Sequence, residues 1–179
     1  MAKTNLASGA HQGTSDSEQD KSRRKSIWDI VYLAVVAEIV LWMDLGAKFL
    51  VRNQLRAGEA IDYKVGEQGF VMLVHLPNAG ISLGMFKNYN MIITYLGLVA
   101  VVVILTYDLV SNQRITLGRF GLALLLGGIL GNLIDRIALG YVTDIFMFAG
   151  FPVFNIADVC IAVGVAYLIV DLVRKELSR

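Results

Sequence analysis

The sequence contains little of what disulfide cross-links and metal sites require. Its 179 residues include one cysteine, Cys160, and two histidines, His11 and His75. A single cysteine excludes an intrachain disulfide, and so few thiol and imidazole groups exclude a metal site built from Cys/His clusters. We therefore expect no metal site of that kind.

Charged residues are also scarce. They make up 17% of the chain, whereas soluble domains carry about 25%. Hydrophobic residues make up 56%, and this balance predicts an integral membrane protein. The net charge of +1 gives no reason to expect a nucleic-acid partner.

Four apolar runs are long enough to cross a membrane, the second only narrowly. They cover residues 27–51, 91–107, 120–139 and 155–173, and a membrane-spanning helix needs about 20 residues, with a range of about 17 to 25. The sequence therefore predicts an all-α polytopic membrane protein, with a four-helix domain over residues 27–179.

The polar segment 1–26 precedes the first run. It has few apolar residues to bury, so we expect a disordered tail. A secretory signal peptide is the alternative, but the apolar run that follows is too long for one and lacks a clean cleavage site.

Basic residues near the ends of the runs predict the orientation, because cytoplasmic loops are enriched in Lys and Arg. Such residues precede the first run, separate the second from the third and follow the fourth, whereas residues 141–150 include none. Both termini are therefore expected in the cytoplasm. The connection 52–90 carries four basic residues, against the rule, but an even number of spans places it outside.

That connection is predicted to contain a small extracytoplasmic β element. Residues 69–76, GFVMLVHL, are β-prone with loose alternation, and a turn-forming stretch, PNAG, follows at 77–80. We expect this element, within about residues 52–90, to lie on the membrane surface between the first and second helices.

Two glycines in the third run predict close helix packing. Gly127 and Gly131 are spaced as GxxxG, a pattern that lets helix backbones approach each other in membranes. A contact within one chain explains the pattern as well as a contact between copies, so no oligomer is indicated.

Four carboxylates are predicted to lie near one depth on the outer side of the membrane. At about 1.5 Å per helical residue, Asp135 lies about 6 Å, and Asp158 about 4 to 5 Å, inside the outer ends of their helices. Asp44 lies about 9 Å below the outer end of the first helix, with Lys48 on the same helix face. Asp144 belongs to the short outer loop. Carboxylates at the edge of a membrane span are costly and usually have a task.

Each of these polar groups also has a structural reading that stays open. Asn155 and Asp158, three residues apart at a helix start, suit a cap with an acid in the first turn. Asp44 and Lys48 suit a buried ion pair, and Asp144 suits a solvated loop acid. The other polar groups suit a helix-end network, formed by Asn132, Asp135 and Arg136, or a turn at Asn78 and Gly80.

Two aspartates that face each other favour one chemistry. Since both cannot ionise cheaply, one keeps a proton near neutral pH. The ionised member can activate water while the protonated member protonates the leaving amide. This is the chemistry of an aspartic peptidase, which needs no metal and no other cofactor.

Three other functions stay open. A proton-coupled transporter would use the acids as a relay, with Glu38 as a step toward the cytoplasm. A Ser/Lys peptidase would use Ser82 as nucleophile and Lys48 as base. A non-enzymatic membrane scaffold would leave the carboxylate cluster unexplained.

Five segments of the chain match motifs of a known family. They are WMDLGAK (42–48), NAGISLGMF (78–86), GGILGNLIDR (127–136), GYVTDIF (140–146) and FNIAD (154–158). GNLIDR and FNIAD at this separation, on the last two spans, are together very specific. From about residue 27 onward the chain resembles lipoprotein signal peptidase (signal peptidase II).

The resemblance implies an aspartic endopeptidase of the bacterial inner membrane. Such enzymes remove signal peptides from diacylglyceryl-modified prolipoproteins by cutting just before the lipidated cysteine. The site would lie at the outer interface, where water reaches the acids while the acyl chains stay among the membrane lipids. Globomycin, the inhibitor of the family, would occupy the same site.

The resemblance also implies a role for each matching residue. The catalytic pair would be Asp144 and Asp158. The supporting and substrate-binding residues would be Asp44, Lys48, Asn78, Gly80, Asn132, Asp135, Arg136 and Asn155. The chain departs from the family at Thr143 and Ile145, where valine and phenylalanine are commoner.

Overall fold

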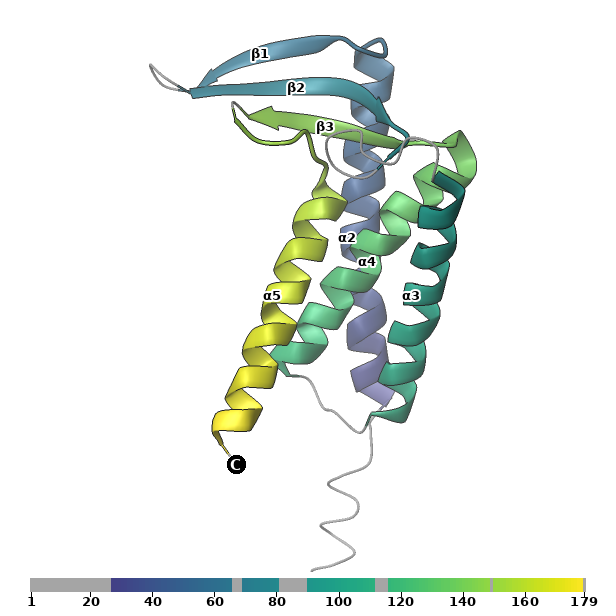
Figure 1. Cartoon of the computed structure of the whole chain (residues 1–179), viewed down its shortest axis with the longest axis vertical. Helices are drawn as coiled ribbons and strands as arrows, with labels where there is room; N and C mark the ends of the chain where they lie inside the picture. Colours follow the sequence, from purple (N-terminus) through teal and green to yellow (C-terminus); the bar gives the residue numbers. More distant parts are fainter. Residues whose placement is uncertain (1–26, 66–68, 81–89, 112–115, 149, 179) are drawn as a thin grey trace, which may run out of the picture.

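Four long helices lie side by side, and a small sheet crosses one end of them (Figure 1). The fold is that of a computed structural model, which describes residues 27–65, 69–80, 90–111, 116–148 and 150–178. The helices are α2 (Ile27–Gln54), α3 (Asn90–Val110), α4 (Leu117–Leu139) and α5 (Ile156–Leu177). The predicted tail 1–26 and Ser82 lie outside the described residues.

All four helices are long and apolar enough to cross a membrane, which confirms the four predicted spans. The helices extend beyond the apolar runs, because local contacts and caps rather than hydropathy determine their ends. α2 continues to Gln54, so Arg52 belongs to the helix and not to the connection after it. α4 begins at Leu117, after the N-cap Thr116, whose side chain accepts a hydrogen bond from the Arg119 amide at 3.3 Å.

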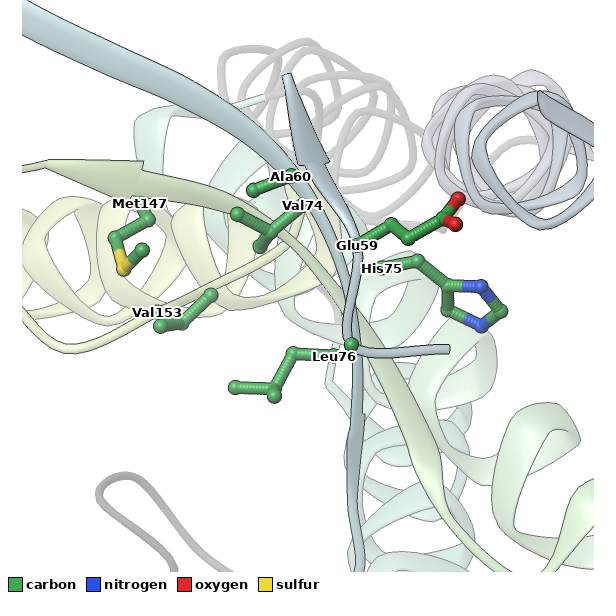
Figure 2. Close-up of a pocket in the computed structure, with 8 residues that line it drawn as sticks. Glu59, Ala60, Val74, His75, Leu76, Met147 and Val153 are labelled. Atoms are coloured by element: carbon green, nitrogen blue, oxygen red, sulfur yellow. The ribbon is translucent and has the colours of Figure 1, made fainter. Parts of the chain in front are cut away.

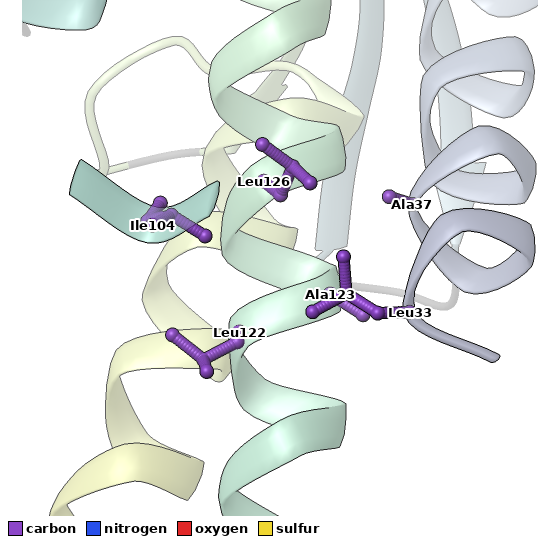
Figure 3. Packing of buried hydrophobic residues seen from close by; sticks show 6 residues of the cluster. All are labelled: Leu33, Ala37, Ile104, Leu122, Ala123 and Leu126. Carbon is purple, nitrogen blue, oxygen red and sulfur yellow. The ribbon is translucent and has the colours of Figure 1, made fainter. Parts of the chain in front are cut away.

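α4 packs against each of the other three helices. Its residues Leu122, Ala123 and Leu126 form a buried apolar cluster with Leu33 and Ala37 of α2 and Ile104 of α3 (Figure 3). The outward faces of the helices carry many exposed apolar side chains. An apolar outer surface of this extent is typical of helices that contact lipid.

β1 (Ala60–Val65), β2 (Gly69–Asn78) and β3 (Val142–Phe148) form an antiparallel sheet in that order. The first two strands confirm the β element predicted between the first and second spans. The third strand comes from the connection between α4 and α5, so the assignment of that connection as a loop was wrong. Its extended form is stabilised by pairing with β2, a contact between segments far apart in the sequence.

The turn predicted at residues 77–80 is only partly present. Pro77 and Asn78 are the last residues of β2 and pair with Thr143 and Val142 of β3. The chain bends only at residues 79 and 80. The pairing therefore places Asn78 on the strand next to the one that carries Asp144.

Candidate active site

The first turn of α5 positions Asp158. Asn155 is the N-cap: its Oδ1 accepts a hydrogen bond from the Asp158 amide at 3.0 Å, and its own amide donates to Asp158 Oδ2 at 3.2 Å. These reciprocal bonds form a capping box, as the helix-cap reading predicted. The other carboxylate oxygen, Asp158 Oδ1, accepts from Asn132 Nδ2 of α4 at 2.8 Å. Asp158 thus serves the cap and still faces α4.

Asp144 lies in β3 and is only 2% exposed. Its two carboxylate oxygens accept hydrogen bonds from two asparagine amides. Asn78 Nδ2 donates to Oδ2 at 2.8 Å, and Asn155 Nδ2 donates to Oδ1 at 3.0 Å. The reading of Asp144 as a solvated loop acid is therefore wrong.

Asn155 contacts both aspartates, so Asp144 and Asp158 belong to one cluster. Burial is the largest cause that raises the pKa of Asp144, from 3.8 to about 6, and the negative charge of Asp158 acts in the same direction. The hydrogen bonds from Asn78 and Asn155 oppose this rise, because they favour the ionised carboxylate. A carboxyl group with a pKa of about 6 can hold or release a proton near neutral pH.

Lys48 is the buried cation of the cluster. Its Nζ lies 2.6 Å from Asp44 Oδ2, donates to Asn132 Oδ1 at 2.9 Å, and lies 3.4 Å from Asp135 Oδ2. The side chains of Asp44 and Lys48 are fully buried, and buried charges are tolerated only when they are paired. Asn132 accepts from Lys48 and donates to Asp158, so it links the ion pair to the aspartate of α5.

Asp44 also joins α2 to the first turn of α5. Its Oδ1 accepts a hydrogen bond from the Ala157 amide at 2.9 Å, one of the amides that a helix leaves unpaired at its start. Gly131 of α4 leaves room for this carboxylate, since a Cβ atom there would lie 2.5 Å from Asp44 Oδ2. Three helices therefore meet at Asp44.

The remaining predicted residues lie around this cluster. Asn78 Oδ1 accepts from the Gly80 amide at 3.0 Å, which orients the Asn78 side chain toward Asp144. Arg136 Nη1 donates to the Asn132 carbonyl at a long 3.4 Å. All ten predicted site residues thus lie at the end of the bundle that the sheet crosses. In the described part of the chain, no group of three or more His, Cys, Asp or Glu side chains is placed to hold a metal ion.

Sequence reasoning missed two members of the cluster, Arg52 and Thr143. Arg52 Nη1 donates to Asp135 Oδ1 and to Thr143 Oγ1, both at 3.0 Å. Arg52 had been counted with the loop that follows the first span. The spacing Asp44, Lys48, Arg52 repeats i, i+4, and it would have placed all three on one helix face.

A separate small cavity lies on the sheet. It has a volume of about 150 Å³ and is lined by residues of β1, β2, β3 and their flanks: Gly58, Glu59, Ala60, Val74, His75, Leu76, Met147 and Val153. Figure 2 shows Val74, Leu76, Met147 and Val153 on one side of β2, with the His75 ring and Glu59 on the other. None of the ten predicted site residues lines it.

Comparison with known proteins gives a consistent picture. A family model described as signal peptidase (SPase) II matches residues 36–174. A protein of Symbiobacterium thermophilum named lipoprotein signal peptidase is 37% identical over 150 residues, which is 82% of this chain and 95% of that protein. The proteins of the same name from Enterococcus faecalis and Brucella ovis are 33% and 31% identical. They align with 82% and 83% of this chain, and with 90% and 92% of their own lengths.

Two solved structures share the fold. Both are described as bacterial membrane enzymes. The first has a TM-score of 0.77 at 22% identity and covers 87% of this chain and 94% of its own. The second has a TM-score of 0.72 at 23% identity and covers 84% and 96%.

Proposed function

Because the chain belongs to the signal peptidase II family, we propose that it is an aspartic endopeptidase that cuts diacylglyceryl-modified prolipoproteins just before the lipidated cysteine. Family membership makes it a membrane protease that cleaves signal peptides from lipoproteins. Aspartate catalysis and the position of the cut are the proposed parts. The observation that carries them is the side chain of Asn155, which contacts Asp144 and Asp158 together.

The proposed mechanism divides the work between the two aspartates. Asp144 has the pKa of about 6 and is deeply buried, so it is the member that holds the proton. Ionised Asp158 takes a proton from water as the water oxygen attacks the carbonyl carbon of the scissile amide. Asp144 gives its proton to the leaving nitrogen as the C–N bond breaks. The products are a carboxylic acid and the amine of the lipidated cysteine.

The other members of the site are proposed to hold this pair in place. Asn78 and Asn155 orient the Asp144 carboxyl, and Asn132 orients Asp158. Lys48 supplies the positive charge behind Asn132. Asp44, Asp135, Gly80 and Arg136 complete the support, and globomycin is expected to compete with substrate for this region.

The site is proposed to lie at the outer interface of the bacterial inner membrane, with both termini in the cytoplasm. The residues from 27 onward would then form one peptidase domain, and 1–26 a cytoplasmic tail. Asp144 lies in β3 of the sheet and Asp158 in the first turn of α5, at the end of the four apolar helices that the sheet crosses (Figure 1). That position lets water reach the acids while the acyl chains of the substrate stay in the bilayer.

The deciding experiment measures cleavage of a lipidated prolipoprotein by the purified protein. Asp144→Asn and Asp158→Asn should each reduce kcat by about 10³-fold or more, because each removes one proton-transfer group. Asp171→Asn is the matched control, since Asp171 pairs with Lys175 near the end of α5 far from the sheet. It should cleave like the wild type.

The products and the alternative mechanisms are tested in the same assay. Mass spectrometry should find the lipidated cysteine as the new N-terminal residue. Cleavage retained by Asp144→Asn or Asp158→Asn, with thermal unfolding unchanged, would exclude the aspartate pair. Loss of cleavage in Ser82→Ala alone would favour the Ser/Lys mechanism, although Lys48 is fully buried between Asp44 and Asn132.

Proton flux into vesicles without cleavage would favour a transporter. The structure offers that function little support, because Glu38, its only suggested step toward the cytoplasm, is exposed on the outward face of α2. The described acids of the cluster are instead held by amides and cations.

A further inference from the structure

One side-chain nitrogen of Arg52 links three elements around the site, α2, α4 and β3. Arg52, in the last turn of α2, donates from Nη1 to Asp135 Oδ1 of α4 and to Thr143 Oγ1 of β3, both at 3.0 Å. The nitrogen carries two hydrogens, so it can make both bonds at once. The Thr143 amide closes the triangle by donating to Asp135 Oδ2 at 3.0 Å.

This triangle is largely buried and pairs a positive with a negative side chain. Thr143 is fully buried, and the Asp135 and Arg52 side chains are 2% and 24% exposed. Hydrogen bonds to a charged partner are the stronger kind, and a buried network specifies one geometry when all its members are paired. The Thr143 hydroxyl therefore has a defined orientation, directed toward Arg52.

Thr143 directly precedes Asp144, so the triangle fixes the strand on one side of that residue. On the other side, the amides of Ile145 and Phe146 both donate to the Phe154 carbonyl, at 3.0 and 2.8 Å. The backbone is thus held immediately before and immediately after Asp144. The hydrogen bonds after Asp144 are between backbone groups. Those before it depend on the side chains of Arg52, Asp135 and Thr143.

We propose that Arg52 and the Thr143 hydroxyl form a positioning pair that sets the angle at which β3 presents Asp144 to the scissile bond. The inference rests on the proposed function, since it assigns the pair to the same catalytic strand. Neither side chain contacts the Asp144 carboxyl, so both act through the backbone of Thr143. Small displacements of a catalytic group lower the rate of the chemical step more than substrate binding.

Thr143→Val and Thr143→Ser test the hydroxyl as a matched pair. Valine keeps the shape of threonine and the hydrogen bond from the backbone amide to Asp135, but it removes the hydroxyl oxygen that accepts from Arg52. We therefore expect kcat to fall about 5- to 10-fold while KM stays unchanged. Serine restores the acceptor and should recover most of kcat. Arg56→Gln removes an exposed cation four residues further along, just past the end of α2, and should leave kcat as it is in the wild type.

A double-mutant cycle tests whether the two residues act through one bond. Arg52→Met also loses the bond to Asp135 and should reduce kcat more than Thr143→Val does. Arg52→Met combined with Thr143→Val should then be no slower than Arg52→Met alone, because the shared bond is already absent. Melting temperatures in detergent, measured for all variants, separate positioning from loss of fold.

The outcomes distinguish this inference from the proposed function. If Asp144→Asn cleaves like the wild type, the proposed function fails and the positioning role fails with it. If cleavage needs Asp144 but Thr143→Val keeps its full kcat, only the positioning inference is overturned. It is also overturned if valine and serine lower kcat equally, or if the two losses in the double variant multiply.

Discussion

The Asp144 carboxyl is a group whose protonation should be visible in the stability of the protein. Its pKa is raised from 3.8 to about 6, mainly by burial. Between these two values the folded state binds more protons than the unfolded state. Stability therefore falls as pH rises through this window, because the ionised carboxylate costs more when buried than when solvated.

Asp144→Asn provides the test, since asparagine does not titrate. The difference in melting temperature, variant minus wild type, should grow as the pH rises from about 4 to about 6 and stay constant above that. Any effect of the new amide on the melting temperature is the same at every pH, and a constant offset has no slope. Thermal unfolding in detergent at a series of pH values measures the difference, and a slope of the opposite sign would contradict the raised pKa.

Single residues also mark the limit of sequence reasoning about the site. Asp158 and Asn155 could be predicted as a pair because a helix cap has a fixed spacing, and the capping box has that spacing. Arg52 was missed because the first apolar run ends before it, whereas the helix does not. The partners of Arg52 lie 83 and 91 residues away, and such contacts leave no local pattern.

Among the helices, α4 depends on glycines where it contacts its neighbours. A Cβ atom on Gly127 would lie 2.5 Å from the Ala37 carbonyl oxygen of α2, and one on Gly128 would lie 2.6 Å from the Ala157 carbonyl oxygen of α5. These oxygens belong to helix backbones, which cannot move aside as a flexible side chain can. The close packing expected from the GxxxG pattern is thus confirmed at Gly127, where α4 meets α2.

Gly127→Ala should therefore destabilise the bundle. Forcing a methyl group into this contact costs about 1 to 3 kcal/mol, and it also separates α4 from the helix that carries Lys48. Gly46→Ala is the control, because Gly46 lies in α2 with no atom near its missing Cβ. There alanine should be neutral or stabilise by up to about 1 kcal/mol. Melting temperatures in detergent compare the two, and equal values would show that the α2–α4 contact tolerates a side chain.

The strands show why some elements escaped prediction. β2 was predicted because residues 69–76 are β-prone on their own. β3 was not, because Val142–Phe148 contains Asp144 and follows directly after α4 with no strand pattern that distinguishes it from a loop. Its pairing with β2, from Val71 opposite Phe148 to Asn78 opposite Val142, is decided by the helices that bring the two segments together.

The whole molecule separates two environments along its length. Four apolar helices make up one part, and the sheet crosses one end of them (Figure 1). The carboxylate cluster lies at that end, since Asp144 belongs to β3 and Asp158 to the first turn of α5. α2 begins and α5 ends at the opposite end. Hydropathy predicted this division because a spanning helix must be apolar over its full length, whereas the sequence says less about how the other three helices are arranged around α4.

The orientation of this arrangement can be tested with cysteine labelling, since Cys160 is the only cysteine to remove. In a Cys160→Ala background, Arg56→Cys places an exposed thiol beside the sheet, and Ser178→Cys places one just after α5. Basic residues cluster near the end that carries Ser178, and cytoplasmic segments are enriched in them. A membrane-impermeant maleimide added to right-side-out vesicles should therefore label Arg56→Cys and spare Ser178→Cys until detergent is added.

The reverse pattern would place the carboxylate cluster on the cytoplasmic side, where the proposed cleavage could not occur. Labelling of both thiols in sealed vesicles would contradict the four-span topology itself.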